Sequence, residues 1–255
     1  VVMLLPPNVN ATQLKQITSQ IDEAAKELDI TVVGGHCEVT PGIDRPILVT
    51  TAIGEAQKQG FVSTGGAKTG DRIIVTKGAA IEGTAILSNE LAELLETKVG
   101  KNVVEKGQEF IKKISVMKDA LTATEVGGVH AMHDATEGGL LGGLQEIAWA
   151  SNIGIVANES KIPIYEETRM ICQALNIDPL KTIGSGALII SADPEKVEKI
   201  VAALQKRDIQ ASIVGEVVNK KEGSYILRND GTKLDLSKPV KEELWNVLGN
   251  HLKKR

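Results

Sequence analysis

The spacing of apolar residues along the chain alternates between the period of strands and the period of helices. From Leu14 to Leu28, apolar residues recur every three or four positions, which predicts an amphipathic helix. Asn10 can cap this helix, with Gln13 at the position that completes a capping box. Short runs rich in β-branched residues predict strands at residues 1–5, 30–33 and 47–53. One helix among short strands predicts a small α+β unit.

A polar, glycine-containing loop at residues 62–70 follows this unit, so we expect a first domain over residues 1–62 and a second over residues 63–255. Mixed strands and helices in the second domain favour layered α/β packing. The predicted strands are residues 72–76, 128–132, 153–157, 187–191, 209–217, 225–228 and 233–236. The predicted helices are residues 81–95, 108–121, 140–148, 166–175, 194–204 (with Pro194 in the first turn) and 240–252.

Composition narrows the class of protein. The chain is 42% hydrophobic but only 2% aromatic, so its core must consist mainly of Val, Ile, Leu and Ala. The net charge is −4, and no long basic block precedes the terminal Lys253-Lys254-Arg255, which argues against nucleic acid as a partner. No apolar run approaches the ~20 residues of a membrane span. Two cysteines, Cys37 and Cys172, lie far apart, which fits the cytoplasm better than a disulfide framework.

The chain starts at Val1 without an initiator Met, and residues 1–5 are too short for a signal peptide. They have the character of a strand inside a domain. We therefore expect an N-terminal segment upstream of this sequence.

The segment Met132-His133-Asp134-Ala135-Thr136-Glu137-Gly138-Gly139 joins a predicted strand directly to a predicted helix. Two glycines allow close approach to backbone N–H groups, and a helix N-terminus favours anions. Asp134 and Glu137 would repel a bare phosphate, so either they cap the helix or a cation lies between them and the anion. An ordinary helix start, with Asp134 or Thr136 as the cap, is the alternative.

Three other motifs could carry chemistry. In Gly34-Gly35-His36-Cys37-Glu38, His36 and Glu38 alternate and can face one side of an extended segment, although a solvated turn explains them equally well. His130, His133 and Asp134, with His36 or Cys37, offer zinc-type ligands at a spacing that matches no standard finger. The segment 77–84 is glycine-rich but lacks the Gly-Lys-Ser/Thr ending of a P-loop, so a structural turn is the better interpretation.

In their order along the chain, these motifs resemble those of the AIR synthase superfamily, and within it the HypE family of hydrogenase-maturation proteins. The segments that carry the resemblance are Gly34–Gly42, Thr51–Gly54, Gly70–Lys77, Ile81–Leu87 and His133–Leu140. The resemblance spans almost the whole chain. It implies an N-terminal α+β domain whose sheet pairs with a second subunit, and a C-terminal α/β domain. It also implies binding of ATP with Mg²⁺ in a cleft between the two domains.

The resemblance implies a role for particular residues. Asp134 and Glu137 would be catalytic, and Glu38 and Asp134 would hold the metal. The nucleotide or its phosphates would be bound by Gly34, Gly35, His36, Glu38, Thr136, Gly138 and Gly139. The expected partners are a small-molecule or carrier-bound substrate, a second copy of the chain and hydrogenase-maturation proteins, without nucleic acid or membrane.

This sequence also departs from the HypE pattern. Ser185 stands where that family has a glutamate, the carrier cysteine of the family's C-terminus is not found, and its upstream nucleotide-binding residues would precede Val1. Three functions therefore stay open: an ATP-dependent enzyme of the HypE type, a synthetase or small-molecule kinase of the same superfamily, and a non-catalytic dimeric scaffold for maturation proteins.

Overall fold

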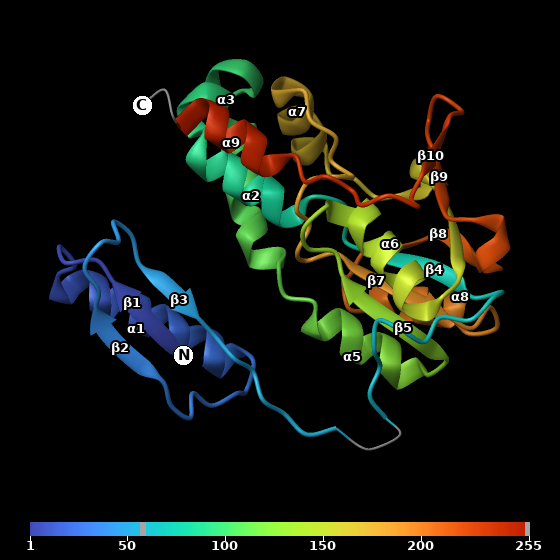
Figure 1. The fold of residues 1–255 in the computed structure, drawn as a ribbon, viewed down its shortest axis with the longest axis horizontal. Coiled ribbons are helices and arrows are strands. Elements are labelled where there is room, and N and C mark those ends of the chain that lie inside the picture. The colour runs from blue at the N-terminus through green and yellow to red at the C-terminus, as the bar shows by residue number, and fades with distance from the viewer. Residues whose placement is uncertain (57–59, 253–255) are drawn as a thin grey trace. The chain divides into compact units, whose positions relative to one another are not determined.

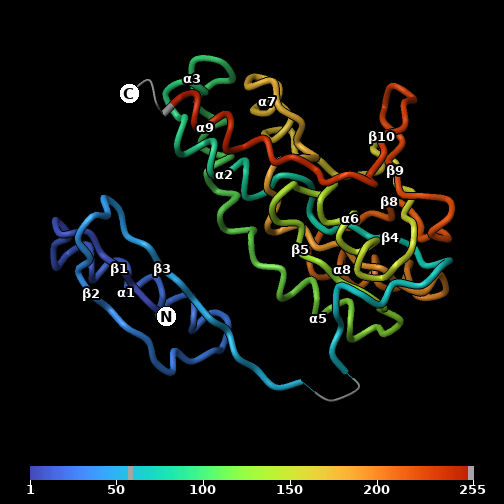
Figure 2. The backbone as a smooth tube through the Cα atoms, viewed as in Figure 1, coloured from blue at the N-terminus to red at the C-terminus, as the bar shows by residue number. Residues whose placement is uncertain are grey.

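The computed structural model describes residues 1–56 and 60–252, and the basic run at residues 253–255 lies outside them. The chain divides into two compact units, Val1–Gly60 and Phe61–Arg255 (Figures 1 and 2). None of the helices within the described ranges combines the length and the apolar character needed to cross a bilayer.

The first unit is a three-stranded sheet with one long helix. The strand β1 (Val2–Leu5) lies between β2 (His36–Val39), to which it is parallel, and β3 (Ile47–Val49), to which it is antiparallel. The helix α1 (Ala11–Glu27) begins at Asn10, whose side chain accepts a hydrogen bond from the Gln13 N–H at 2.9 Å. The Gln13 side chain in turn accepts from the Asn10 N–H at 3.0 Å, so the predicted capping box is confirmed.

The strand predicted at residues 30–33 is wrong, because pairing with β1 starts only after the Gly-Gly turn. A Cβ added to Gly35 would lie 1.7 Å from the Val1 carbonyl oxygen, so only glycine lets the chain come alongside β1 at that point. The β-branched run before it is left without a strand partner, and Val33 is 89% exposed. The strand expected at residues 47–53 is also shorter, since β3 ends at Val49.

The second unit contains a seven-stranded sheet in the order β10-β9-β6-β8-β4-β7-β5. All neighbours pair antiparallel except β6 and β9, which are parallel. The strands are β4 (Arg72–Thr76), β5 (Val129–Asp134), β6 (Gly154–Asn158), β7 (Leu188–Ala192), β8 (Ala211–Val218), β9 (Tyr225–Leu227) and β10 (Lys233–Asp235). Each strand predicted in this unit is confirmed, with ends that differ by at most two residues. The predicted α+β and α/β fold class is also confirmed.

The helices of the second unit follow the prediction less closely. They are α2 (Ile81–Glu90), α3 (Ala92–Val99), α4 (Lys101–Gln108), α5 (Met117–Val126), α6 (Gly139–Ser151), α7 (Glu166–Leu175), α8 (Val197–Gln205) and α9 (Leu244–Leu252). The single helix predicted at residues 81–95 is two helices. Pro194 lies before α8 rather than in its first turn, and α9 starts four residues later than predicted.

The helix predicted at residues 108–121 is wrong for a physical reason. The chain there forms a short 3₁₀ turn (Glu109–Lys113) and then starts the separate helix α5. The Lys77 ammonium group donates to the carbonyl oxygens of Lys113, at 3.1 Å, and Ser115, at 2.8 Å. These carbonyls are therefore bound by a side chain and not by a continuous helix.

Helices cover both faces of the large sheet. Ile73 and Val75 of β4 pack with α6, through a cluster that includes Leu144 and Ile147. Ile74 points to the opposite face and packs with residues of α5 and α8, such as Ala123 and Leu204. This alternation along one strand is what a sheet buried on both faces requires. A further apolar cluster joins α2, α3, α4, α7 and α9.

The start of α6 depends on a close backbone contact. Gly139 has φ +61°, and a Cβ there would lie 2.6 Å from the Thr182 carbonyl oxygen and 2.7 Å from that of Leu180. The Leu141 N–H donates to the same Leu180 carbonyl at 3.1 Å. Gly139 is therefore required for packing, independently of any ligand.

We predict that Gly139→Ala destabilises the second unit far more than Gly231→Ala. Gly231 also has a positive φ (+83°), but open space surrounds its Cβ position, so that variant has only the left-handed backbone cost of about 1–2 kcal/mol. Gly139→Ala adds overpacking against backbone, which costs about a further 1–3 kcal/mol. Urea unfolding of the two variants measures the difference. An equal loss of stability would contradict the packing role of Gly139.

Candidate functional site

Antiparallel pairing brings three loops of the second unit to one edge of the sheet. The strand β7 lies between β4 and β5 and runs opposite to both, so the carboxyl ends of β4 and β5 lie beside the amino end of β7. The loops at this edge are residues 77–80, 134–139 and 182–187, and we call them together the loop edge. They are joined by hydrogen bonds, among them Ala135 N–H to the Ala187 carbonyl at 3.0 Å.

Asp134 is one of two acidic residues in the loops of this edge, the other being the exposed Glu137. Asp134 ends β5, is half-buried, and accepts a hydrogen bond from the Gly186 N–H at 3.4 Å. Burial raises the pKa of the Asp134 carboxyl, and nearby Glu82 also raises it. The Gly186 N–H, His133 and Lys77 act in the opposite direction but do not cancel the effect. The ionised carboxylate therefore lies where a further positive charge would stabilise it.

Two charged residues that follow β4, Lys77 in the turn and Glu82 in the first turn of α2, both influence the Asp134 pKa. Burial lowers the pKa of Lys77, whose ammonium group also donates to Asp119 Oδ2 at 3.2 Å. Lys77 is thus committed to internal contacts, as expected of a structural turn. Glu82 differs, because its Oε2 is buried and has no hydrogen-bond partner in the part of the chain that the structure describes.

The anion site predicted at the start of α6 already holds a carboxylate of this chain. Glu242 Oε2 accepts from the Gly138 N–H at 2.8 Å, and its Oε1 accepts from the Ile183 N–H at 3.2 Å. Oε1 also accepts from the N–H groups of Glu243 and Leu244, at 3.0 and 2.9 Å. Glu242 thereby ties the start of α9 to two loops of the edge. The sequence could not reveal this contact, because 104 residues separate Glu242 from Gly138.

The other predicted residues of this turn have simpler surroundings. Thr136 and Glu137 are exposed, whereas Gly138 and Gly139 are buried. The cap of α6 is Gly138, with no side-chain cap hydrogen bond. The alternative in which Asp134 or Thr136 caps the helix is therefore wrong. Ser185 lies in the same group of loops, directly before the Gly186 whose N–H binds Asp134.

The first unit contains the remaining predicted residues. His36 Nε2 lies 3.2 Å from Glu38 Oε2, so these two side chains share one face of β2 as expected. Gly34, Gly35 and His36 line a pocket of about 420 Å³, and Glu38 also accepts from the Thr40 hydroxyl at 3.2 Å. Glu38 and Asp134 belong to different units, so a metal site shared by them stays a prediction.

The zinc hypothesis finds no support. Within residues 1–56 and 60–252, no three His, Cys, Asp or Glu side chains gather in a way that could hold a metal ion. His130 Nδ1 lies 2.9 Å from Asp71, which also accepts from the buried Ser191 hydroxyl at 2.7 Å. His133 contacts Thr64 and Glu146 instead. The two histidines therefore take part in separate hydrogen-bond networks.

Comparison with known proteins assigns both parts of the chain to one protein family. Residues 1–56 match the N-terminal domain of AIR synthase related proteins, and residues 68–228 match the C-terminal domain. A hydrogenase expression/formation protein of Methanocaldococcus jannaschii is 30% identical over 226 residues, which are 88% of this chain and 65% of that protein. Carbamoyl dehydratase HypE of Escherichia coli is 26% identical over 236 residues, 91% of this chain and 67% of its own length.

Solved structures show the same fold. Hydrogenase maturation protein HypE in complex with ATP superposes with a TM-score of 0.73 at 23% identity, covering 96% of this chain and 73% of HypE. HypE in a HypE–HypF complex gives 0.70 at 24% identity, with 93% and 76% covered. The chain spans about two thirds of the length of the first curated relatives. The chain belongs to the AIR synthase related protein family, with the two-domain fold seen in HypE.

Proposed function

We propose that this chain binds Mg²⁺-ATP and uses its phosphates in a HypE-like reaction. The observation that carries the proposal is the loop edge, where burial raises the pKa of the Asp134 carboxyl, together with Glu82 at the start of α2, whose charge also raises that pKa and whose buried Oε2 has no hydrogen-bond partner among the described residues. The solved structure of HypE in complex with ATP supports ATP as the nucleotide. The predicted cleft between the two domains is part of the proposal.

Asp134 and Glu82 fit a magnesium ion by the chemistry of their donors. Mg²⁺ takes hard oxygen ligands, and one or two carboxylates together with substrate phosphates suffice to hold it. A bound Mg²⁺ would neutralise phosphate charge and polarise the transferred group. Asp134 and Glu82 would hold this ion, and the earlier prediction adds Glu38 from the first unit.

The other residues would bind and position the nucleotide. The pocket at Gly34, Gly35 and His36 would receive it in the first unit. Thr136 and Glu137, both exposed on the turn before α6, would face the phosphates and the substrate, with Asp134 or Glu137 available to accept a proton. Phosphoryl transfer depends mainly on positioning and charge neutralisation, which such a set of residues can provide.

A second function is favoured by one observation, the serine at position 185. A dehydratase that acts on a carrier thiol needs a base to deprotonate it. Ser185 is half-buried beside the Asp134–Gly186 hydrogen bond but cannot serve as that base. A synthetase or small-molecule kinase of the same superfamily does not need the glutamate that the HypE family has in place of Ser185. A scaffold that binds maturation proteins does not need it either.

We further propose that the chain forms a homodimer in the cytoplasm and binds hydrogenase-maturation proteins. The small sheet of the first unit exposes apolar side chains, including Val39 (57%), Leu48 (43%) and Val49 (53%). Val39 and Leu48 lie on one face of this sheet, since they pair with Leu5 and Met3 of β1, and exposed apolar side chains on one face are typical of an interaction surface. The relatives named for hydrogenase formation, and the HypE structure solved with HypF, support such partners.

The raised pKa of Asp134 predicts the sign of a pH effect. Because the folded state holds the Asp134 proton more tightly than the unfolded state, the free energy of unfolding falls as pH rises through this pKa. Asp134→Asn removes the charge and keeps the bond from Gly186, so we expect it to be more stable than wild type at neutral pH. The advantage should shrink as the pH falls below ~3.9, the ordinary pKa of Asp, because Asp134 then becomes protonated in the unfolded state as well.

Thermal unfolding between about pH 3.5 and pH 7.5, with and without Mg²⁺, measures this prediction. Added Mg²⁺ should stabilise wild type more than Asp134→Asn. The matched control is Asp208→Asn, an exposed position with φ +58° that asparagine tolerates, and it should show neither effect. A pH-independent difference between Asp134→Asn and wild type would contradict the argument.

We predict that wild type binds Mg²⁺-ATP and that Asp134→Asn lowers phosphate release at least about tenfold, because a charge-neutralising ligand is lost. Calorimetric titration and a phosphate assay measure the two quantities, again with Asp208→Asn as the control. Binding without turnover by wild type, together with capture of a maturation protein, would favour the scaffold. If wild type does not bind Mg²⁺-ATP even at millimolar concentration, the proposed function is wrong.

A further inference from the structure

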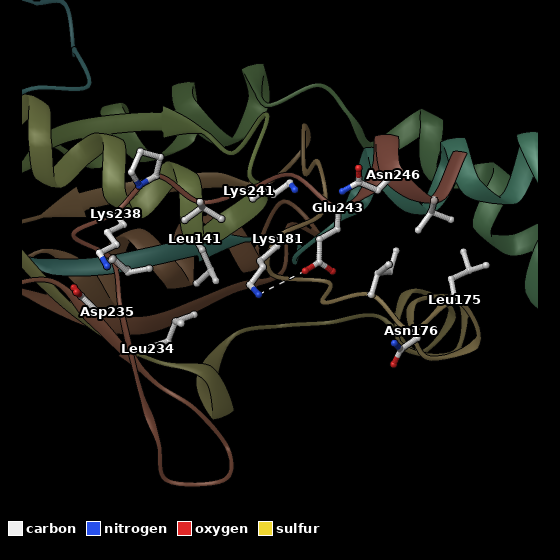
Figure 3. A pocket seen from close by; sticks show the side chains of 15 residues that line it. Leu141, Leu175, Asn176, Lys181, Leu234, Asp235, Lys238, Lys241, Glu243 and Asn246 are labelled. Atoms are coloured by element: carbon white, nitrogen blue, oxygen red, sulfur yellow. Dashed lines mark ion pairs between the residues drawn. The ribbon is translucent and has the colours of Figure 1, made fainter. Parts of the chain in front are cut away.

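A second pocket, of about 580 Å³, lies within the second unit and is separate from the residues proposed to bind phosphate (Figure 3). One wall comes from the segment between α7 and β7, and the other from residues 234–247 at β10 and α9. We call residues 236–243 the C-terminal strap. On this strap Glu242 binds the start of α6, while its neighbour Glu243 lines the pocket. The strap therefore stands between the pocket and the loop edge.

The lining combines an apolar surface with cationic side chains. The apolar part includes Leu141, Leu175, Ile177, Leu234, Val240 and Val247. Lys181, Lys238 and Lys241 surround it, and Figure 3 shows Lys238 at one end and Asn176 at the other. A volume of several hundred Å³ with apolar walls and a few convergent polar groups is typical of small-molecule sites.

The carboxylates of the lining are already bound. Asp235 accepts from the N–H and the hydroxyl of Ser237, at 2.8 and 2.6 Å. Glu243 accepts from the Asp178 N–H at 2.7 Å and pairs with Lys181 at 3.5 Å (Figure 3). Lys238 and Lys241, in contrast, form no ion pair with any residue that the structure describes. Lys238 and Lys241 are therefore charged groups of the lining without an ion-pair partner among the described residues, and the amides of Asn176 and Asn246 add uncharged donors and acceptors.

We propose that this pocket binds a small amphipathic anion, with an apolar or aromatic body against the leucines and a carboxylate, sulfonate or phosphate group at Lys238 or Lys241. The walls at residues 234–247 fall outside the segment that matches the AIR synthase family, residues 68–228. The other wall, which includes Leu141, Leu175 and Lys181, lies within that segment, so only part of the site falls outside the matched family domain. This proposal does not depend on the proposed binding and use of ATP.

Fluorescence titration with 8-anilinonaphthalene-1-sulfonate tests the proposal, because this probe has an aromatic body and one anionic group. We expect saturable binding that weakens about tenfold or more in Lys238→Glu/Lys241→Glu, a change worth about 1.4 kcal/mol. The control is Lys199→Glu/Lys206→Glu, which makes the same charge change at two exposed positions of α8 and its C-cap, and which should bind as wild type does.

Two further measurements locate the site and identify its chemistry. Upon probe binding, the side-chain amide resonances of Asn176 and Asn246, which line the pocket, should shift. The uncharged analogue N-phenyl-1-naphthylamine should bind more weakly than the sulfonate. Equal binding by the lysine double variant, equal binding of the uncharged analogue, or shifts confined to other residues would each overturn the proposal.

Discussion

The antiparallel pairing of β7 with both β4 and β5 decides which residues of the second unit meet at the loop edge. It places the ends of two strands and the start of a third at one edge, so that residues from positions 77 to 187 meet. Asp134 is half-buried there because β5 ends between these loops. The raised pKa of its carboxyl follows from that burial. The same pairing therefore sets both the position of the acid and its electrostatic character.

Close packing and possible ligand binding compete for the same backbone groups at this edge. Gly139 has no room for a Cβ because the carbonyls at residues 180 and 182 lie against it, and the Gly138 N–H is bound by Glu242. A glycine-rich turn of this kind resembles a phosphate cradle in sequence, yet part of its donor capacity is used inside the protein. The carboxyl groups at and beside the loop edge are Asp134, with its raised pKa, and Glu82, with a buried Oε2 that has no partner among the described residues, and they suit a cation that accompanies phosphate better than phosphate alone.

Local patterns predicted the fold best where several of them agreed. The strand at residues 72–76 and the helix at residues 166–175 match to the residue, because β-branched composition or helical spacing coincides there with clear flanking turns. The strand expected at residues 30–33 failed because pairing depends on where Gly35 can approach Val1. The helix expected at residues 108–121 failed because Lys77, 36 residues earlier, binds the Lys113 carbonyl. Neither constraint is visible in a local window of sequence.

The residues of the candidate site also fall into those that the sequence could predict and those that it could not. Asp134 and its turn could be predicted because they form one contiguous motif at a strand end. Glu82 and Glu242 could not, since only the folded chain places a residue of α2 and a residue of the C-terminal strap beside that motif. The resemblance to the AIR synthase superfamily identified the family, but it could not show which of the turn's N–H groups are already bound.

The most direct test of the loop edge as the phosphate and metal site is paramagnetic broadening of backbone amide resonances by Mn²⁺-ATP, with Mg²⁺-ATP as the diamagnetic reference. Mn²⁺ prefers the same oxygen ligands as Mg²⁺. We predict the strongest broadening at Thr136, Gly186 and the neighbours of Glu82, and its loss in Asp134→Asn. Saturable binding of Mn²⁺-ATP that broadens only resonances away from these loops would contradict the account.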